Sequence, residues 1–204
     1  MDLPVSEAAE RNKEPILKVL KQVIRASDRR LLEIGAGTGQ HAVFFAPQFP
    51  QLEWTATETA APLPLLNRRI QESQVPNLTP PRKLTVGEDS IPNRTYDVVF
   101  TANTFHIMSW KECKTLIKEL SGALQEGGRV VIYGPFNYGG TYTSDSNAEF
   151  DEYIKEKFPG GGLRAFEDVS NAMAKHGFEL VRDFEMPANN RTLVFRRLKY
   201  IGKK

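Results

Sequence analysis

The feature that most constrains this chain is the stretch RRLLEIGAGTGQHA at residues 29–42. A short apolar run leads directly into Gly35, Gly37 and Gly39, and a helical pattern follows them. Glycine lets a backbone turn sharply and approach a ligand closely, and a strand–loop–helix of this kind forms the nucleotide-binding turn of open α/β sheets. The stretch therefore predicts a nucleotide-like ligand beside this strand, unless the glycines serve only the geometry of the turn.

The rest of the chain alternates short apolar runs with helical patterns. Such alternation predicts an α/β fold, with a mostly parallel sheet covered by helices on both faces. The predicted strands lie at 30–34, 52–57, 83–86, 96–102, 129–133, 178–186 and 192–198. The predicted helices lie at 15–24, 40–49, 63–73, 109–124 and 166–177, with Gly127 and Gly128 expected to end the fourth. Because only residues 187–191 separate the last two strands, we expect an antiparallel hairpin.

Length and composition bound the class of protein. The chain has 204 residues, 40% apolar and 25% charged, as in one soluble domain of ordinary size. Its net charge of +2 gives no sign of a nucleic-acid partner, and no stretch reaches the ~20 apolar residues of a membrane span. The lone Cys113 excludes an internal disulfide, and residues 1–17 lack the apolar core of a signal peptide. We therefore expect a cytoplasmic protein with no membrane partner.

Three residues around the loop bear on the identity of the ligand. A dinucleotide fingerprint would place its third glycine at position 40, where this chain has Gln40. Glu33 lies two residues before the first glycine, and its carboxylate would repel a phosphate but attract an ammonium or a sulfonium. Glu58, at the end of the second strand, can accept both hydroxyls of a ribose. These residues favour S-adenosylmethionine (SAM) over NAD.

The motif Glu-x-Gly-x-Gly-x-Gly, followed 19 residues later by an acid, resembles the class I SAM-dependent methyltransferases. The resemblance implies a Rossmann-like, mostly parallel seven-stranded sheet in the order 3-2-1-4-5-7-6, with a C-terminal antiparallel hairpin. The runs AAERNKEPIL, ANTFHIMSW, YGPF, SNAEFD and EMPANNRTLVFRR together resemble the methyltransferase-like 26 family. This narrower resemblance implies a fold and a cofactor, and no substrate. Where that family tends to carry an acid in the third strand this chain has Thr85, so Glu88 or Asp89 would face the adenine instead.

Ligands of open α/β sheets bind beyond the carboxyl ends of the strands, and the candidate residues are sorted by that rule. We assign to the cofactor Asn12, Glu33, Gly35, Ala36, Gly37, Gly39, His41, Glu58, Asp89 and Asn103. We assign to the acceptor and its chemistry His106, Tyr142, Asn147 and Asn190, and we assign no metal ligand. Purely structural roles stay open as alternatives for four of these residues: a helix cap for Asn12, a first-turn position for His41, a packed loop residue for His106 and an ordinary hairpin turn for Asn190.

Residues 135–162 fit neither the strand nor the helix pattern. This insertion is rich in aromatic, hydroxyl and amide side chains, and a connection of such length is usually functional. The sixth strand should deliver the turn at 187–191 to the same edge, so we expect the insertion and the turn to form the acceptor pocket together. Residues 1–28 are expected to form a helical lid within a single domain spanning 1–204.

The predicted activity is SAM-dependent transfer of a methyl group to an unidentified small molecule. The segment TANTFH after the fourth strand lacks the Asn-Pro-Pro-Tyr or Asp-Pro-Pro-Tyr box of amino-group methylases. The alternatives are a protein methyltransferase, a non-catalytic SAM-binding protein that acts through a protein partner, and an NAD-linked oxidoreductase. The oligomeric state is open.

Overall fold

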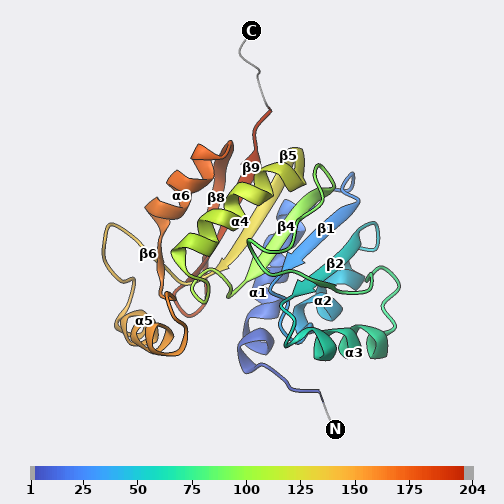
Figure 1. Ribbon diagram of the computed structural model, residues 1–204, viewed down its shortest axis with the longest axis horizontal. Helices are drawn as coiled ribbons and strands as arrows, with labels where there is room; N and C mark the ends of the chain where they lie inside the picture. Colours follow the sequence, from blue (N-terminus) through green and yellow to red (C-terminus); the bar gives the residue numbers. More distant parts are fainter. Residues whose placement is uncertain (1–2, 200–204) are drawn as a thin grey trace.

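The computed structural model describes residues 3–199, which form an α/β structure around one central sheet (Figure 1). The sheet has seven strands in the order β3-β2-β1-β4-β5-β9-β8, and β9 runs antiparallel to both of its neighbours, β5 and β8, while the other pairs are parallel. The strands are β1 Arg30–Ile34, β2 Glu53–Glu58, β3 Arg82–Lys83, β4 Tyr96–Ala102, β5 Leu124–Gly134, β8 Phe178–Met186 and β9 Asn190–Arg197. The predicted fold class, strand order and C-terminal hairpin are confirmed.

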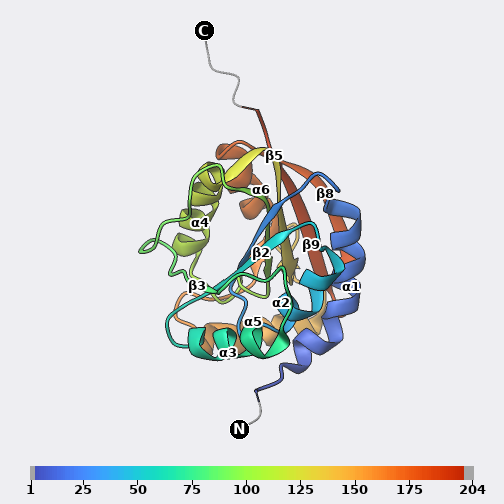
Figure 2. The same ribbon diagram turned by 90° about the vertical axis from the view of Figure 1, so that its right-hand side faces the viewer.

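Helices cover both faces of the sheet, because adjacent residues along each buried strand point to opposite sides. Figure 2 shows α4 and α6 on one side of the sheet and α1 on the other. The two hydrophobic clusters follow this division: Leu32 packs with α4 and α6, whereas Leu31 packs with α1, α2 and α3. The helices are α1 Glu7–Val23, α2 Gln40–Phe45, a 3-10 turn Ala46–Gln48, α3 Leu63–Ser73, α4 Trp110–Ala123, α5 Asp145–Lys157 and α6 Phe166–Lys175. Within residues 3–199, no helix is long and apolar enough to cross a membrane.

Several predicted boundaries are wrong. The first helix starts at Glu7, eight residues before Pro15, because the Ser6 hydroxyl caps it by accepting the backbone N–H of Ala9. Asn12 lies inside this helix and is buried, so it is not a cap. The third strand pairs over only two residues, and α4 passes directly into β5. Gly127 and Gly128 therefore belong to β5, beside a register irregularity, and do not end the helix.

The insertion contains a helix, α5, that no apolar pattern in the sequence predicts (Figure 1). Its buried face consists of Asn147, Asp151 and Ile154, of which two are polar. The carboxylate of Asp151 accepts hydrogen bonds from the hydroxyl of Tyr142 at 2.7 Å and the backbone N–H of Leu163 at 2.6 Å. A short parallel pair, β6 Phe136–Asn137 with β7 Arg164–Ala165, joins the two ends of the insertion. The insertion is therefore folded around a buried carboxylate.

A second buried carboxylate lies in the main sheet. Glu33 on β1 is 2% exposed, and its Oε2 accepts the indole N–H of Trp54 on β2 at 2.7 Å. Burial raises the pKa of Glu33 from 4.5 to about 7, although the bond from Trp54 opposes this shift. The folded state therefore binds this proton more tightly than the unfolded chain does.

This pKa predicts a specific loss of stability with pH. The stabilising contribution of Glu33 protonation is fully present below pH 4.5 and is lost as pH rises through about 7. In Glu33→Gln the amide oxygen still accepts from Trp54, but nothing ionises. The free energy of unfolding of the variant relative to wild type should therefore rise by up to about 3 kcal/mol across this window. Urea unfolding followed by circular dichroism at a series of pH values measures this difference, and parallel pH profiles would contradict it.

Candidate functional site

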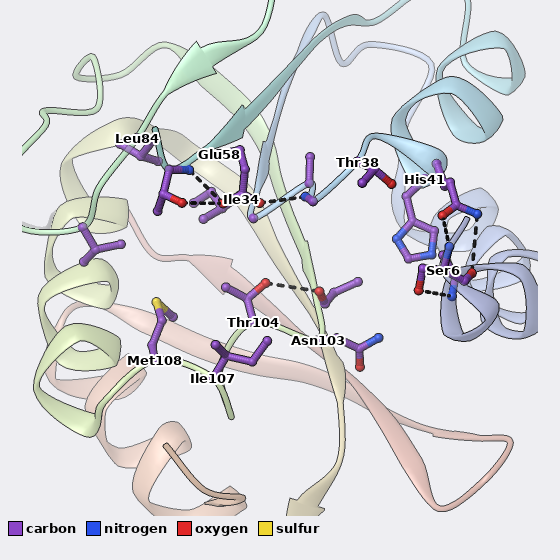
Figure 3. A pocket seen from close by; sticks show the side chains of 18 of the residues that line it. Ser6, Ile34, Thr38, His41, Glu58, Leu84, Asn103, Thr104, Ile107 and Met108 are labelled. Atoms are coloured by element: carbon purple, nitrogen blue, oxygen red, sulfur yellow. Dashed lines mark hydrogen bonds between the residues drawn. The ribbon is translucent and has the colours of Figure 1, made fainter. Parts of the chain in front are cut away.

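A cavity of about 460 Å³ lies beyond the carboxyl ends of β1, β2 and β4 (Figure 3). The glycine loop forms one wall, and the residues after β3 and β4 and the start of α1 form others. In Figure 3, Ser6 and His41 stand on one side of the cavity and Ile107 and Met108 on the opposite side. Several residues that the sequence assigned to the cofactor line it: Gly35, Ala36, Gly37, His41, Glu58 and Asn103. We call this the first cavity.

The glycines of the loop have different physical roles. All three have positive φ angles, 68° for Gly35, 56° for Gly37 and 84° for Gly39. A Cβ on Gly35 would lie 2.7 Å from the hydroxyl of Thr104, and one on Gly39 would lie 2.7 Å from Leu66 Cδ1. A Cβ on Gly37 would meet nothing within 4 Å. Packing therefore requires Gly35 and Gly39, whereas Gly37 leaves space open in the cavity.

The carboxylate of Glu58 fixes the loop from the end of β2. Its Oε2 accepts the backbone N–H of Gly37 at 2.7 Å, and its Oε1 accepts the backbone N–H of Thr59, also at 2.7 Å. The backbone N–H of Ala36 bonds the carbonyl of Thr57 at 3.0 Å and holds the loop on the same strand. Each carboxylate oxygen has two lone pairs, so Glu58 keeps acceptor capacity toward the cavity that it lines.

The other predicted cofactor residues lie outside this lining. Glu33 is beneath the loop and bonded to Trp54, and Gly39 packs against α3. Asp89 turns back to accept the backbone N–H of Thr85 at 2.8 Å, and this bond lowers the pKa of Asp89. The wall after β3 is formed by Leu84, Thr85 and Val86 instead of the acid.

Asn12 on α1 contacts His41, which lines the first cavity. Its Oδ1 lies 2.7 Å from Nε2 of His41, whose ring stacks on Phe45 with centroids 5.2 Å apart. Burial lowers the pKa of His41 to about 4, so the ring is neutral at pH 7. Asn12 also hydrogen-bonds the side chain of Tyr133 at the end of β5. This buried amide therefore joins α1 to α2 and to the sheet.

A second cavity, of about 740 Å³, adjoins the first one. It lies between the first turns of α1, the start of α5 and the turn between β8 and β9. Among the described residues, Ser6 and Asn103 line both cavities. Asn103 directly follows β4 and has a φ of 58°, a conformation that asparagine tolerates better than most residues. The wall of the second cavity includes the predicted residues Asn12, His106, Asn147 and Asn190.

His106 lines the second cavity from the segment that follows β4. It is 4% exposed, and its ring lies edge-on to Phe150 with centroids 5.4 Å apart. Burial, together with the charge of Arg164, lowers the pKa of His106 to about 4. Among residues 3–199, neither ring nitrogen has a hydrogen-bond partner. The ring is therefore neutral at pH 7 and is a weak base, able to take a proton only from a strongly acidic group on a ligand.

The remaining acceptor candidates differ in position. Tyr142 bonds Asp151 and lies outside the lining of the second cavity. Asn147 donates to the carbonyl of Asn189 at 3.3 Å and so ties α5 to the β8–β9 turn. The amide of Asn190 donates to two carbonyls of that same turn. The positive φ angles of the turn fall on Ala188 and Asn189, not on Asn190.

Among the residues of the first cavity that sequence reasoning missed are two polar ones, Ser6 and Gln40. Ser6 was overlooked because the helix was expected to begin at Pro15, although a serine followed by an acidic first turn is a helix-start signal. Gln40 was read only as a missing glycine, yet its side chain lines the cavity and bonds the backbone of Ser6. Sequence spacing predicts neither contact, because each joins residues that are 30 or more positions apart.

Solved structures with the same fold are methyltransferases. An O-methyltransferase family protein from Burkholderia thailandensis matches with a TM-score of 0.80 and 15% identity, over 95% of this chain and 58% of that one. Human N-acetylserotonin methyltransferase, in complex with SAM, matches with a TM-score of 0.79 and 13% identity, over 95% and 53%. An O-methyltransferase family 2 protein from Planctomyces limnophilus, in complex with apigenin, matches with a TM-score of 0.79 and 14% identity, over 94% and 60%. These likenesses establish the class I methyltransferase fold.

A comparison of sequences also finds a methyltransferase. The L-tyrosine C(3)-methyltransferase of Streptomyces lavendulae is 28% identical over 104 residues, which are 51% of this chain and 28% of that protein. The chain thus spans about half of each solved structure above and less of this curated relative. Residues 3–197 match the family described as "Protein of unknown function (DUF938)", and the chain belongs to that family.

Proposed function

We propose that the chain binds SAM in the first cavity and transfers its methyl group to a small molecule held in the second. The observation that carries this proposal is the junction of the two cavities at the strand edge, where Ser6 and Asn103 belong to both walls. Methyl transfer requires a nucleophile to approach the methyl carbon in line with the breaking bond. Positioning of this kind can supply roughly 7–11 kcal/mol of barrier reduction.

The chemistry of the first cavity suits SAM better than NAD. Gly37 leaves open space beside the loop, and Glu58 presents a carboxylate of the kind that accepts ribose hydroxyls. Among the described residues that line this cavity there is no Lys or Arg, whereas Glu58 and Glu112 are both present. A pyrophosphate would have no cation to pair with there, while a sulfonium and an ammonium would be attracted.

The residues of the second cavity act on the acceptor. The neutral ring of His106 would take the proton that an acceptor hydroxyl releases when its oxygen forms the new bond to carbon. SAM supplies the electrophilic methyl group and leaves as S-adenosylhomocysteine. Side-chain amides of Asn103, Asn147 and Asn190 would orient a polar acceptor, and Phe150 would contact its apolar part.

A small-molecule acceptor is favoured over a protein by the enclosing elements. The first turns of α1, the start of α5 and the β8–β9 turn surround the second cavity, which fits the 300–1,000 Å³ typical of small-molecule pockets. Two similar methyltransferases are named for tyrosine and N-acetylserotonin and a third is in complex with apigenin, all of which are small molecules. The narrower likeness to the methyltransferase-like 26 family and a cytoplasmic location are part of this proposal.

The first test concerns the open space beside Gly37. The wild type should bind SAM with low-micromolar affinity, about −8 kcal/mol, and Gly37→Val should abolish binding by filling the cavity. Gly139 is the matched control, because its φ of 58° is nearly the same and a Cβ there also meets nothing within 4 Å. Both variants should lose roughly 1–2 kcal/mol of stability from backbone strain. Calorimetry with SAM and NAD measures this, and tighter binding of NAD by the wild type would overturn the proposal.

The second test concerns Glu58. Glu58→Ala should weaken SAM binding by several kcal/mol at most, since a hydrogen bond to a charged group contributes roughly 1.5–3 kcal/mol. The residue also holds the loop through Gly37, so affinity alone does not separate the two roles.

A change in the ligand separates ribose binding by Glu58 from its role in holding the loop. If Glu58 accepts the ribose hydroxyls, replacing S-adenosylhomocysteine by its 2′-deoxy analogue should cost the wild type much more affinity than it costs Glu58→Ala. Equal losses in both proteins would assign Glu58 to the loop alone.

The third test concerns His106. Turnover is followed as release of S-adenosylhomocysteine against a panel of small hydroxyl and amine compounds. With the best acceptor found, His106→Gln should lower kcat by 10²–10⁴-fold, the range for loss of a general base, and leave SAM affinity unchanged. The same substitution at His176, which lies at the C-terminal end of α6, is the control. Unchanged turnover in His106→Gln would exclude it as the proton acceptor.

A further inference from the structure

The N-terminal part of the chain forms one wall of the first cavity. Residues 3–14, which we call the strap, comprise a short extended segment, the cap Ser6 and the first two turns of α1. Ser6 and Ala9 line the first cavity, and Ser6 also lines the second. Figure 3 shows Ser6 beside His41, across the cavity from Met108. Removal of the strap would therefore open both cavities at once.

The strap is fastened to α2 and α3, the two helices that follow β1 and β2. The backbone N–H of Ser6 donates to Gln40 Oε1 at 2.5 Å, and Gln40 Nε2 donates to Glu10 Oε1 at 2.9 Å. Arg69 Nη2 on α3 donates to the carbonyl of Pro4 at 2.6 Å. These bonds tie both the extended segment and the first helical turn to the rim of the cavity.

The strap differs from the rest of α1 in how it is held. Beyond Pro15 the helix packs its apolar residues on the sheet, and Ile16, Val19 and Leu20 are each at most 4% exposed. Of the strap residues, only Asn12 is buried. Pro15 has no N–H for the carbonyl of Arg11, so the helix lacks one hydrogen bond where the two parts meet. Polar bonds therefore hold the strap, whereas apolar packing holds the remainder of the helix.

We propose that the strap closes over bound SAM, and that Gln40 and Arg69 are positioning residues that keep it closed. This inference rests on the proposed function. SAM enters and leaves when the bonds to Gln40 and Arg69 and the contact of Asn12 with His41 break, and the helix bends at Pro15. Because Ser6 completes both walls, the second cavity takes its final shape only with the strap shut. Cofactor binding therefore precedes acceptor binding.

Arg69 provides the sharper test, because it does not line the first cavity and acts on the ligand only through the strap. Arg69→Met keeps the apolar stem that packs near Gly39 but removes the donor to Pro4. It should speed SAM dissociation by roughly threefold to tenfold, as expected for the loss of one net hydrogen bond. Arg69→Lys, which retains a donor, should restore most of the slow rate. Gln40→Leu should speed dissociation further.

The experiment measures SAM dissociation by stopped-flow fluorescence and trypsin cleavage at Arg11 and Lys13. In the wild type, SAM should slow cleavage at these two sites, and in Arg69→Met it should slow cleavage much less. Gln22→Leu is the control, because Gln22 lies on the same helix outside the strap and its side chain bonds the carbonyl of Lys18 within that helix. The melting temperatures of the ligand-free variants should stay within a few degrees of wild type.

The outcomes separate this inference from the proposed function. If the wild type binds no SAM, the proposed function itself fails. If it binds SAM but Arg69→Met changes neither dissociation nor cleavage, the strap is a fixed wall and the inference is overturned. Faster dissociation that is accompanied by a large loss of ligand-free stability, without rescue by Arg69→Lys, would also overturn it.

Discussion

The site depends on the conformation of the loop between β1 and α2. Three residues with positive φ alternate along it, and two of them are pressed against neighbours that leave no room for a side chain. Gly35 meets Thr104, which Thr101 holds at the end of β4 by a 2.8 Å hydrogen bond. Gly39 meets Leu66, a residue of α3 that is fully buried in the core. The loop is therefore wedged between a strand end and a helix, and the remaining glycine faces the cavity.

The position of this loop determines where the other parts of the site can lie. Glu58 reaches the loop from the next strand, and the first turn of α2 carries Gln40 and His41 toward α1. The strap is bonded to those same residues, and Asn12 extends the connection to Tyr133 and the second cavity. The first cavity, the strap and the second cavity are thus linked through short polar contacts that all begin at one turn of the chain.

Much of this fold could be predicted from the sequence, because the parallel sheet follows from alternating apolar and amphipathic runs. The loop and Glu58 were found for the same reason, since both follow directly from strand ends. The helix α5 was missed because Asn147 and Asp151 occupy its buried face, so apolar periodicity is absent. The start of α1 was missed because Pro15 resembles a first helical residue. The assignment of Asp89 ignored local turn chemistry, in which the backbone N–H of Thr85 competes for the carboxylate.

The central claim is that SAM occupies the first cavity with its reacting end toward Asn103. A crystal structure of the protein soaked with S-adenosylhomocysteine tests this most directly. The account predicts ribose hydroxyls within hydrogen-bond distance of Glu58, the methionine part beside Gly37, and the sulfur at the junction with the second cavity. Density for the ligand at any other place, or a cavity that stays empty at millimolar ligand, would contradict it.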